Sequence, residues 1–152
     1  MPGRGDAFPV PDAVVPDQHG DRVALRELWE QGAALLVLVP AAFSTHCTAE
    51  LGALAFDIER FDDAGVQLAA LSCDPVTSLR AWGEKGGYPF PLLSDFWPHG
   101  EVSRALGGFD AELGLAQRLS LLVVDGVVRW VLRGELDAPR SLTAHLGALD
   151  VV

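Results

Sequence analysis

The chain has 152 residues, of which 49% are hydrophobic and 21% are charged, and its formal net charge is −10 at pH 7. This length fits a single folded domain over residues 1–152. No stretch rich in lysine or arginine interrupts the acidic composition, which argues against nucleic-acid binding and against attraction to anionic membranes. A small neutral substrate suits such a surface better than a polyanion does.

The sequence also indicates where the protein works. The longest apolar run, residues 33–39, is far shorter than the ~20 residues that a membrane-spanning helix needs. Residues 1–6 lack the apolar segment of a secretory signal, and two cysteines are too few for a disulfide scaffold. We therefore expect a cytoplasmic protein whose thiols stay reduced.

Apolar runs, prolines and glycines predict an α/β domain. Residues 1–12 have the composition of an irregular arm, in which residues 1–6 are expected to be flexible. Asp125-Gly126 is a strong hairpin signal between two apolar runs. In chain order the expected elements are a hairpin of 14–15 with 22–25, a helical turn at 25–29, a strand at 33–39, a helix at 44–62, a strand at 67–72, a helix at 75–85, a strand at 90–94, a short helix at 99–106, strands at 120–124 and 127–132, and a closing helix at 139–149.

The order of these elements predicts a mixed sheet with helices on both faces and an N-terminal hairpin extension. Residues 33–39 are apolar throughout, which is typical of a central strand that is covered on both sides. In open α/β sheets, functional residues gather where the carboxyl ends of strands meet the amino termini of helices. The junction between Val39 and the helix that begins near Ser44 is such a place.

Cys47 lies in this junction and is the main candidate for chemistry. Ser44 or Thr45 can act as the N-cap of the helix, so Cys47 falls in its first turn. There the unpaired backbone N–H groups and the helix dipole favour negative charge, and the thiolate is the reactive form of cysteine. The alternative is that Cys47 is a buried structural cysteine, which is a common role for free cysteines.

The residues around Cys47 resemble the active-site motif of the peroxiredoxins, P-x3-(T/S)-x2-C. Pro40, Ser44 and Cys47 stand at that spacing, and Glu50 occupies a position where the family usually has an acid. Within this AhpC/TSA superfamily, the chain is most similar to one-cysteine peroxiredoxins of the AhpE type. That likeness extends over about residues 5 to 133 and rests also on Arg118, Ala81-Trp82, the run 90–100 and Val102-Ser103.

The resemblance implies a thioredoxin-like fold and a thiol-dependent peroxidase without cofactor or metal. Cys47 would attack hydrogen peroxide, an alkyl hydroperoxide or peroxynitrite and become a sulfenic acid. Pro40 would shield the sulfur, and Ser44 would hydrogen-bond the sulfur and the peroxide. Arg118 would stabilise the thiolate and the charge that develops on the breaking O–O bond.

Two departures from the family pattern leave another function open. Ser44 replaces the threonine that most members carry, and His46 stands where an apolar residue is common. A redox sensor, or an enzyme repurposed for another reaction on the same fold, could use the same cysteine. A thioredoxin-type dithiol enzyme is disfavoured because residues 47–50 do not form a C-x-x-C pair.

Cys73 follows the second predicted strand, on the side of the sheet where we expect Cys47. It is either a resolving cysteine that forms a disulfide with the oxidised Cys47, or a small core residue. Position 52, where one peroxiredoxin class has its resolving cysteine, is Gly52. The likeness to one-cysteine enzymes therefore implies an external thiol, such as mycothiol with a mycoredoxin, or a glutaredoxin-like or thioredoxin-like protein.

The remaining predictions concern partners and histidines. Family members commonly form homodimers, and Trp97 in its proline-flanked loop is a candidate for the subunit contact. The four histidines show no metal-ligand spacing, and we expect them in solvated or capping roles.

Overall fold

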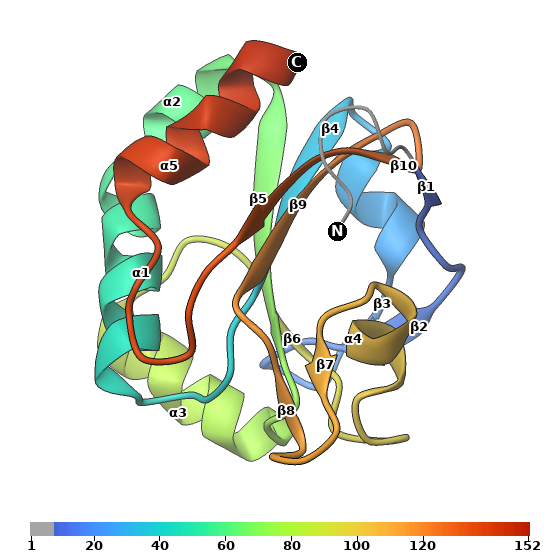
Figure 1. Cartoon of the computed structure of the whole chain (residues 1–152), viewed down its shortest axis with the longest axis vertical. Coiled ribbons are helices and arrows are strands. Elements are labelled where there is room, and N and C mark those ends of the chain that lie inside the picture. The colour runs from blue at the N-terminus through green and yellow to red at the C-terminus, as the bar shows by residue number, and fades with distance from the viewer. Residues whose placement is uncertain (1–7) are drawn as a thin grey trace.

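A mixed sheet in the order β1-β10-β9-β4-β5-β6 runs through the molecule (Figure 1). The computed structural model describes residues 8–152, and the predicted flexibility of residues 1–6 lies outside this range. The strands β4, β5 and β6 are parallel, whereas β9 is antiparallel to β4, β10 to β9 and β1 to β10. The bounds of the strands are Phe8–Pro9 for β1, Ala33–Leu38 for β4, Val66–Ser72 for β5, Leu92–Ser94 for β6, Leu119–Val124 for β9 and Val127–Arg133 for β10.

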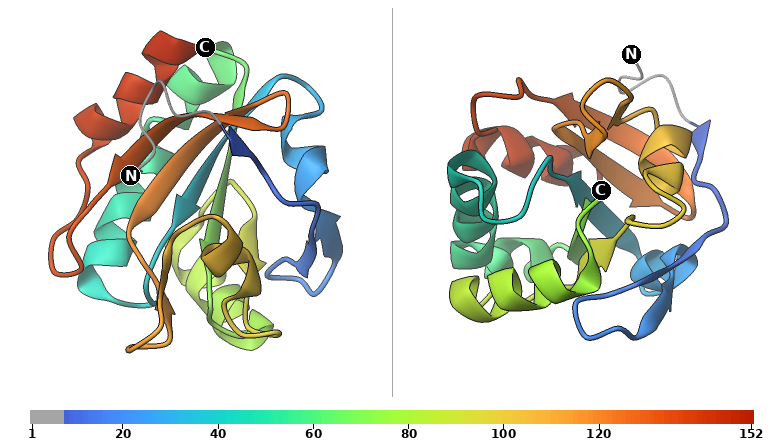
Figure 2. Two further views of the ribbon diagram at one scale, coloured as in Figure 1. Left: turned by 45° about the vertical axis from the view of Figure 1, so that its right-hand side comes forward. Right: turned by 90° about the horizontal axis from the view of Figure 1, so that it is seen from below.

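Helices cover one face of this sheet, and a mixed layer covers the other (Figures 1 and 2). The first face carries α1 (Thr45–Phe56), α2 (Ile58–Asp63), α3 (Val76–Gly86), α5 (Leu142–Leu146) and the 3-10 helix Gly147–Val151. The opposite face carries the hairpin β2 (Val14–Pro16) and β3 (Arg22–Ala24), the 3-10 helix Leu25–Trp29, α4 (Glu101–Ala105) and the hairpin β7 (Phe109–Asp110) and β8 (Leu115–Ala116). The predicted α/β class with an N-terminal hairpin is confirmed.

The central strand β4 separates two hydrophobic cores. All six of its residues are buried, as the uninterrupted apolar run predicts. Because side chains alternate along a strand, Leu35 and Val37 pack against the helical face, whereas Leu36 and Leu38 pack against the opposite layer. The apolar contacts on both faces fix the carboxyl end of β4, from which the loop to α1 starts.

Two predicted helices are shorter than expected. The helix predicted over 44–62 is interrupted at Asp57, whose φ of −110° and ψ of 25° are not helical, and α2 follows. The closing helix begins only after Ser141, whose side chain accepts a hydrogen bond from the N–H of Ala144. Pro139 and Arg140 therefore precede this helix, and Ser141 is its N-cap.

The amino-terminal arm is not wholly irregular. Phe8 pairs with Val128 and Pro9 with Val127, so that β1 forms the edge of the sheet. Proline is tolerated at such an edge because its missing N–H would face away from the neighbouring strand.

The short hairpin of β7 and β8 was also not predicted, since its two-residue strands give no clear alternating pattern. Within residues 8–152, no helix combines the length and the apolar character needed to cross a membrane.

We expect the core around β4 to dominate stability. Leu35 has an exposed fraction of 0%, and Leu35→Ala should lower the free energy of unfolding by about 2–5 kcal/mol, through lost burial and a residual cavity. Phe56→Ala, at a side chain that is 91% exposed, should change it by less than about 0.5 kcal/mol. Urea denaturation of both variants measures this, and equal losses would contradict the assignment of the core.

Candidate active site

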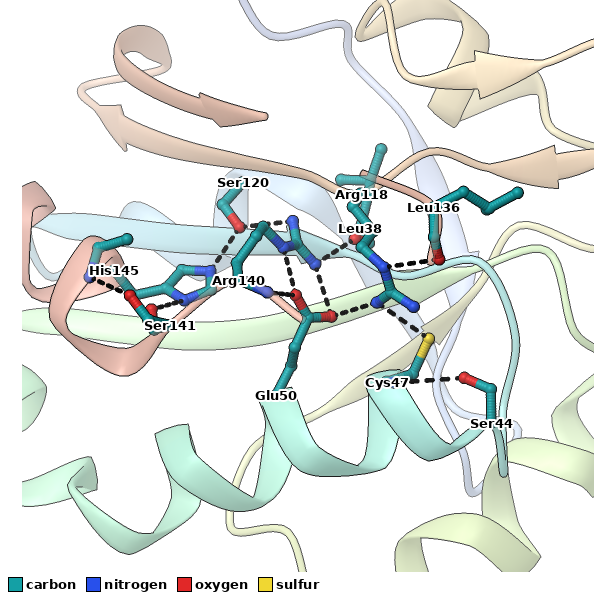
Figure 3. A network of polar contacts seen from close by, with 11 residues as sticks. Leu38, Ser44, Cys47, Glu50, Arg118, Ser120, Leu136, Arg140, Ser141 and His145 are labelled. Atoms are coloured by element: carbon teal, nitrogen blue, oxygen red, sulfur yellow. Dashed lines mark hydrogen bonds and ion pairs between the residues drawn. The ribbon is translucent and has the colours of Figure 1, made fainter. Parts of the chain in front are cut away.

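The first turn of α1 carries Cys47 at the carboxyl end of β4. Ser44 has an extended backbone and is the N-cap of α1, and its hydroxyl oxygen accepts a hydrogen bond from the N–H of Cys47 at 3.2 Å (Figure 3). Of the two residues that the sequence offered as caps, Ser44 therefore takes the role. The Cys47 side chain is buried, with an exposed fraction of 0%. Pro40 is also buried, in the loop that joins β4 to α1.

This loop is anchored to the neighbouring strand. Asp74 follows β5, and its carboxylate accepts hydrogen bonds from the N–H of Ala42 and the hydroxyl of Ser72, both at 2.8 Å. Phe43 adopts a φ of 65°, a left-handed conformation that L-residues rarely occupy. Asp74 was not among the predicted site residues, although its place after a parallel strand could have pointed to it. The anchor fixes the approach of the chain to Ser44 and Cys47.

Arg118 contacts Cys47 from the residue that precedes β9, the strand next to β4. Leu119 is paired with Leu38 in the antiparallel ladder of β9 and β4, so that Arg118 lies beside the carboxyl end of β4. Its Nη1 donates a hydrogen bond to the Cys47 sulfur at 3.4 Å, and its Nε donates to the Leu136 carbonyl at 3.2 Å. A buried guanidinium in contact with sulfur can stabilise a negative charge on that sulfur by charge and by hydrogen bonding.

Glu50 holds this guanidinium in place. It follows Cys47 by three residues on α1 and therefore lies on the same face of the helix. Its buried carboxylate forms ion pairs with Arg118 and with Arg140. Burial alone would raise the pKa of Glu50, but hydrogen bonds and charge from Arg140, followed by the charge of Arg118, hold that pKa below its ordinary value.

Arg140 extends the network away from the sulfur. Its backbone N–H and its Nε both donate to Glu50 Oε2 at 2.6 Å, and its Nη2 donates to the Leu38 carbonyl at 2.8 Å. Its Nη1 donates to the Ser120 hydroxyl at 2.8 Å, and that hydroxyl is 2.8 Å from His145 Nε2 (Figure 3). Sequence reasoning missed Arg140 because it lies outside the Cys47 motif and 90 residues from Glu50.

Comparison with known proteins identifies the family of this chain. Residues 7–131 match the model of the AhpC/TSA family. The chain is 38% identical over 144 residues to alkyl hydroperoxide reductase E of Mycobacterium tuberculosis, which covers 91% of this chain and 94% of that protein. It is 31% identical to the 1-Cys peroxiredoxin PER1 of Arabidopsis thaliana, with 99% of this chain and 72% of that protein covered.

The chain belongs to the AhpC/TSA family. It is a peroxiredoxin, that is, a thiol peroxidase. The crystal structure of the peroxidoxin BcpB from Mycobacterium tuberculosis agrees with this fold, with a TM-score of 0.83 at 26% identity over 95% of this chain and 94% of that one. The predicted thioredoxin-like fold and the resemblance to peroxiredoxins are thus confirmed.

Cys73 does not share the surroundings of Cys47 in this peroxiredoxin. We expected both cysteines on one side of the sheet, but Cys73 packs into the core on the opposite face, together with Val102 and Ala116. Its sulfur is 3.9 Å from the Ser103 hydroxyl. Burial, and to a lesser extent the charge of Asp95, raises the pKa of the Cys73 thiol to about 11, which disfavours the nucleophilic thiolate. The expectation was wrong because Ser72 and Cys73 continue the alternation of β5, which turns Cys73 to the other face.

Two cavities reach the surroundings of the site. One of about 230 Å³ is lined by Arg118 together with Gln117, Arg133 and Leu136. Another, of about 400 Å³, lies over the start of α1 and is lined by Phe43, Thr45, Thr48, Trp82, Lys85 and Tyr88. The second is the more aromatic of the two and lies next to the N-terminal turn that carries the sulfur.

His145 is the histidine whose position differs most from expectation. The four histidines were expected in solvated or capping roles, but the exposed fraction of His145 is 1%. Its Nδ1 is 3.1 Å from the Ser141 carbonyl and its Nε2 contacts Ser120. Burial, followed by the charge of Arg140, lowers the pKa of His145 to about 4. The imidazole is therefore neutral at neutral pH.

This burial should make stability depend on pH. Between the ordinary value of 6.5 and about 4, the unfolded chain binds a proton at His145 that the folded protein does not bind. The free energy of unfolding therefore falls as the pH falls through this window, by up to about 3 kcal/mol. Urea denaturation from neutral pH to about pH 4 should show that His145→Gln lacks this part of the slope. Identical slopes in the two proteins would contradict the assignment.

Proposed function

We propose that Cys47 is the thiol of this peroxidase that reacts with the peroxide. The observation that carries the proposal is the 3.4 Å contact between Arg118 Nη1 and the Cys47 sulfur, in the first turn of a helix. The guanidinium and the free N–H groups of the turn stabilise a thiolate there. Because the sulfur is buried, water does not weaken this electrostatic stabilisation.

The first chemical step is a displacement at oxygen. The Cys47 thiolate attacks the terminal oxygen of the peroxide, an S–O bond forms and the O–O bond breaks. Cys47 becomes a sulfenic acid, and the departing hydroxide or alkoxide takes up a proton and leaves as water or an alcohol. With peroxynitrite the leaving group is nitrite. Sulfur is oxidised by two electrons, and the peroxide is reduced by two.

Arg118, Ser44 and Pro40 serve this step in different ways. Arg118 stabilises the negative charge that passes from sulfur to the departing oxygen. The Ser44 oxygen accepts from the Cys47 N–H, so its own proton is available to donate to the peroxide or the sulfur. Pro40, which is buried in the loop between β4 and α1, limits the access of water to the sulfur in this proposal.

An external thiol completes the cycle. A thiol attacks the sulfenic sulfur, which releases water and forms a mixed disulfide, and a second thiol then frees Cys47. The position of Cys73 in the opposite core, with its raised pKa, supports this route over an internal disulfide. We propose mycothiol with a mycoredoxin, or a glutaredoxin-like or thioredoxin-like protein, as the reductant.

The substrates are hydrogen peroxide, alkyl hydroperoxides and peroxynitrite. The name of the mycobacterial relative, alkyl hydroperoxide reductase E, supports the second of these. The aromatic cavity over the start of α1 has room for an apolar substituent. We further propose that the protein works in the cytoplasm. We also propose that it forms a homodimer, because Phe96 and Trp97 leave 47% and 82% of their surfaces exposed.

Rapid mixing with peroxide tests the proposal. Reduced protein mixed with one equivalent of hydrogen peroxide should give a fast change in tryptophan fluorescence, and mass spectrometry should find one added oxygen on Cys47. Cys47→Ser should abolish the signal, whereas Cys73→Ser should retain it. A wild-type rate no faster than that of a free thiol would overturn the proposal. Sustained turnover with an added thiol reductant separates an enzyme from a redox sensor.

Substitutions at Ser44 test the role of its hydroxyl. Ser44→Ala removes the hydroxyl and should lower the rate constant with peroxide by about a hundredfold, the loss typical of one missing donor. Ser44→Thr keeps the hydroxyl and should stay within about threefold of wild type, since a threonine retains the same cap and donor. Equal rates for Ser44→Ala and the wild type would show that the hydroxyl takes no part.

A further inference from the structure

A buried pair of polar residues lies at the far end of the network from the sulfur. Ser120 is on β9 and His145 on α5, and their exposed fractions are 0% and 1%. Neither touches Cys47, and the proposed reaction assigns them no role. Yet the Ser120 hydroxyl contacts both His145 and Arg140 at 2.8 Å (Figure 3).

The direction of each hydrogen bond here follows from elementary chemistry. Arginine can only donate, so the Ser120 oxygen accepts from Arg140 Nη1. The single proton of the hydroxyl must then point to its other partner, His145 Nε2, which has to be unprotonated. The second ring nitrogen, Nδ1, carries the proton and donates to the Ser141 carbonyl. One tautomer of neutral histidine satisfies all of these contacts.

The series of hydrogen-bond donors and acceptors continues from Arg140 to the sulfur. Arg140, oriented by Ser120, donates through its Nε and its backbone N–H to Glu50 Oε2, and through its Nη2 to Glu50 Oε1 at 3.1 Å. Glu50 Oε1 also accepts from Arg118 Nη1, the same nitrogen that contacts Cys47. Each group in this series therefore has one arrangement of donors and acceptors, and the series ends at the guanidinium that faces the reacting atom.

We propose that His145 is a positioning residue for the reaction of Cys47 with peroxide, acting through Ser120, Arg140 and Glu50 on the Arg118 guanidinium. This inference rests on the proposed function, because it presupposes that Cys47 is the reacting thiol. His145 keeps the Ser120 hydroxyl turned so that its oxygen faces Arg140. Without that acceptor the hydroxyl proton has no fixed partner and can turn toward Arg140, which weakens one of the contacts that fix the plane of the Arg140 guanidinium.

Protonation of His145 would reverse this arrangement. The groups that face it are the Ser141 carbonyl at the start of α5, the Ser120 hydroxyl from β9, the Arg140 guanidinium, and the Glu50 carboxylate from α1. A protonated Nε2 would donate to Ser120, which would leave the serine proton without this acceptor and place a second positive charge near Arg140. Burial and Arg140 both oppose that state, in accord with the lowered pKa of about 4.

A double-mutant cycle tests the connection. His145→Leu and Ser120→Ala should each lower the rate constant of Cys47 with hydrogen peroxide, by about three- to thirtyfold. Because both residues act through one contact with Arg140, the double variant should be no slower than the slower single variant. The inference would be overturned if the rate losses of the two single variants multiplied in the double variant, or if His145→Leu reacted as fast as the wild type.

Two further variants separate positioning from general stability. His145→Gln keeps a side-chain oxygen that can accept the Ser120 proton, and it should restore the rate to within about threefold of wild type. Leu146→Ala, at a neighbouring side chain packed against the helical core, should destabilise α5 without slowing the reaction. The inference fails if Leu146→Ala slows the reaction as much as His145→Leu does, or if His145→Gln rescues nothing.

Ultraviolet absorbance of the thiolate at neutral pH supplies a readout that stability does not move, and the acid limb of the rate profile supplies a second one over the pH range in which circular dichroism shows each protein still folded. The thiolate signal of Cys47 at neutral pH should shrink in His145→Leu and persist in His145→Gln. The wild-type rate should fall as His145 is protonated toward pH 4, and His145→Gln should lack that step. Failure of the proposed function looks different: the wild type itself would then show no fast oxidation that Cys47→Ser abolishes.

Discussion

The buried carboxylate of Glu50 is the group on which the site depends. Two guanidinium groups, Arg118 and Arg140, are buried against it, so the network without the sulfur carries two positive charges and one negative charge. Unpaired charge is costly away from water, and breaking a buried pair typically costs about 3–5 kcal/mol. In the proposed reaction, a thiolate at Cys47 supplies the second negative charge.

The fold brings these groups together from distant parts of the chain. Glu50 and Cys47 share one face of α1, whereas Arg118 precedes β9 and Arg140 precedes α5. The antiparallel pairing of β9 with β4 places Arg118 at the end of β4 from which α1 begins. Arg140 then bonds to the Leu38 carbonyl at that same strand end. The Glu50–Arg118 ion pair therefore joins α1 to the start of β9, and the Glu50–Arg140 ion pair joins α1 to the segment before α5.

Local patterns predicted the parts of the molecule that depend on neighbours in sequence. The apolar run of β4, the capped start of α1 and the Cys47 motif are of this kind, and so were readily found. The place of Arg118 came from family resemblance. Arg140, Ser120 and His145 interact over 20 to 90 residues and follow no spacing rule, so that only the three-dimensional structure joins them. The prediction for Cys73 was wrong for a local reason. The end of β5 was located correctly, but the face of the sheet to which the Cys73 side chain points was not.

The charge states of the network agree with one another across a defined range of pH. Glu50 must be ionised to hold both arginines, and the arginines themselves keep its pKa low. His145 must be neutral to accept from Ser120, and the same Arg140 helps to keep its pKa low. One cation thus stabilises a charged carboxylate on one side and an uncharged imidazole on the other. The ionised state of Glu50 and the neutral state of His145 are both lost only in acid. The hydrogen bonds that orient Arg118 toward Cys47 therefore persist through neutral pH.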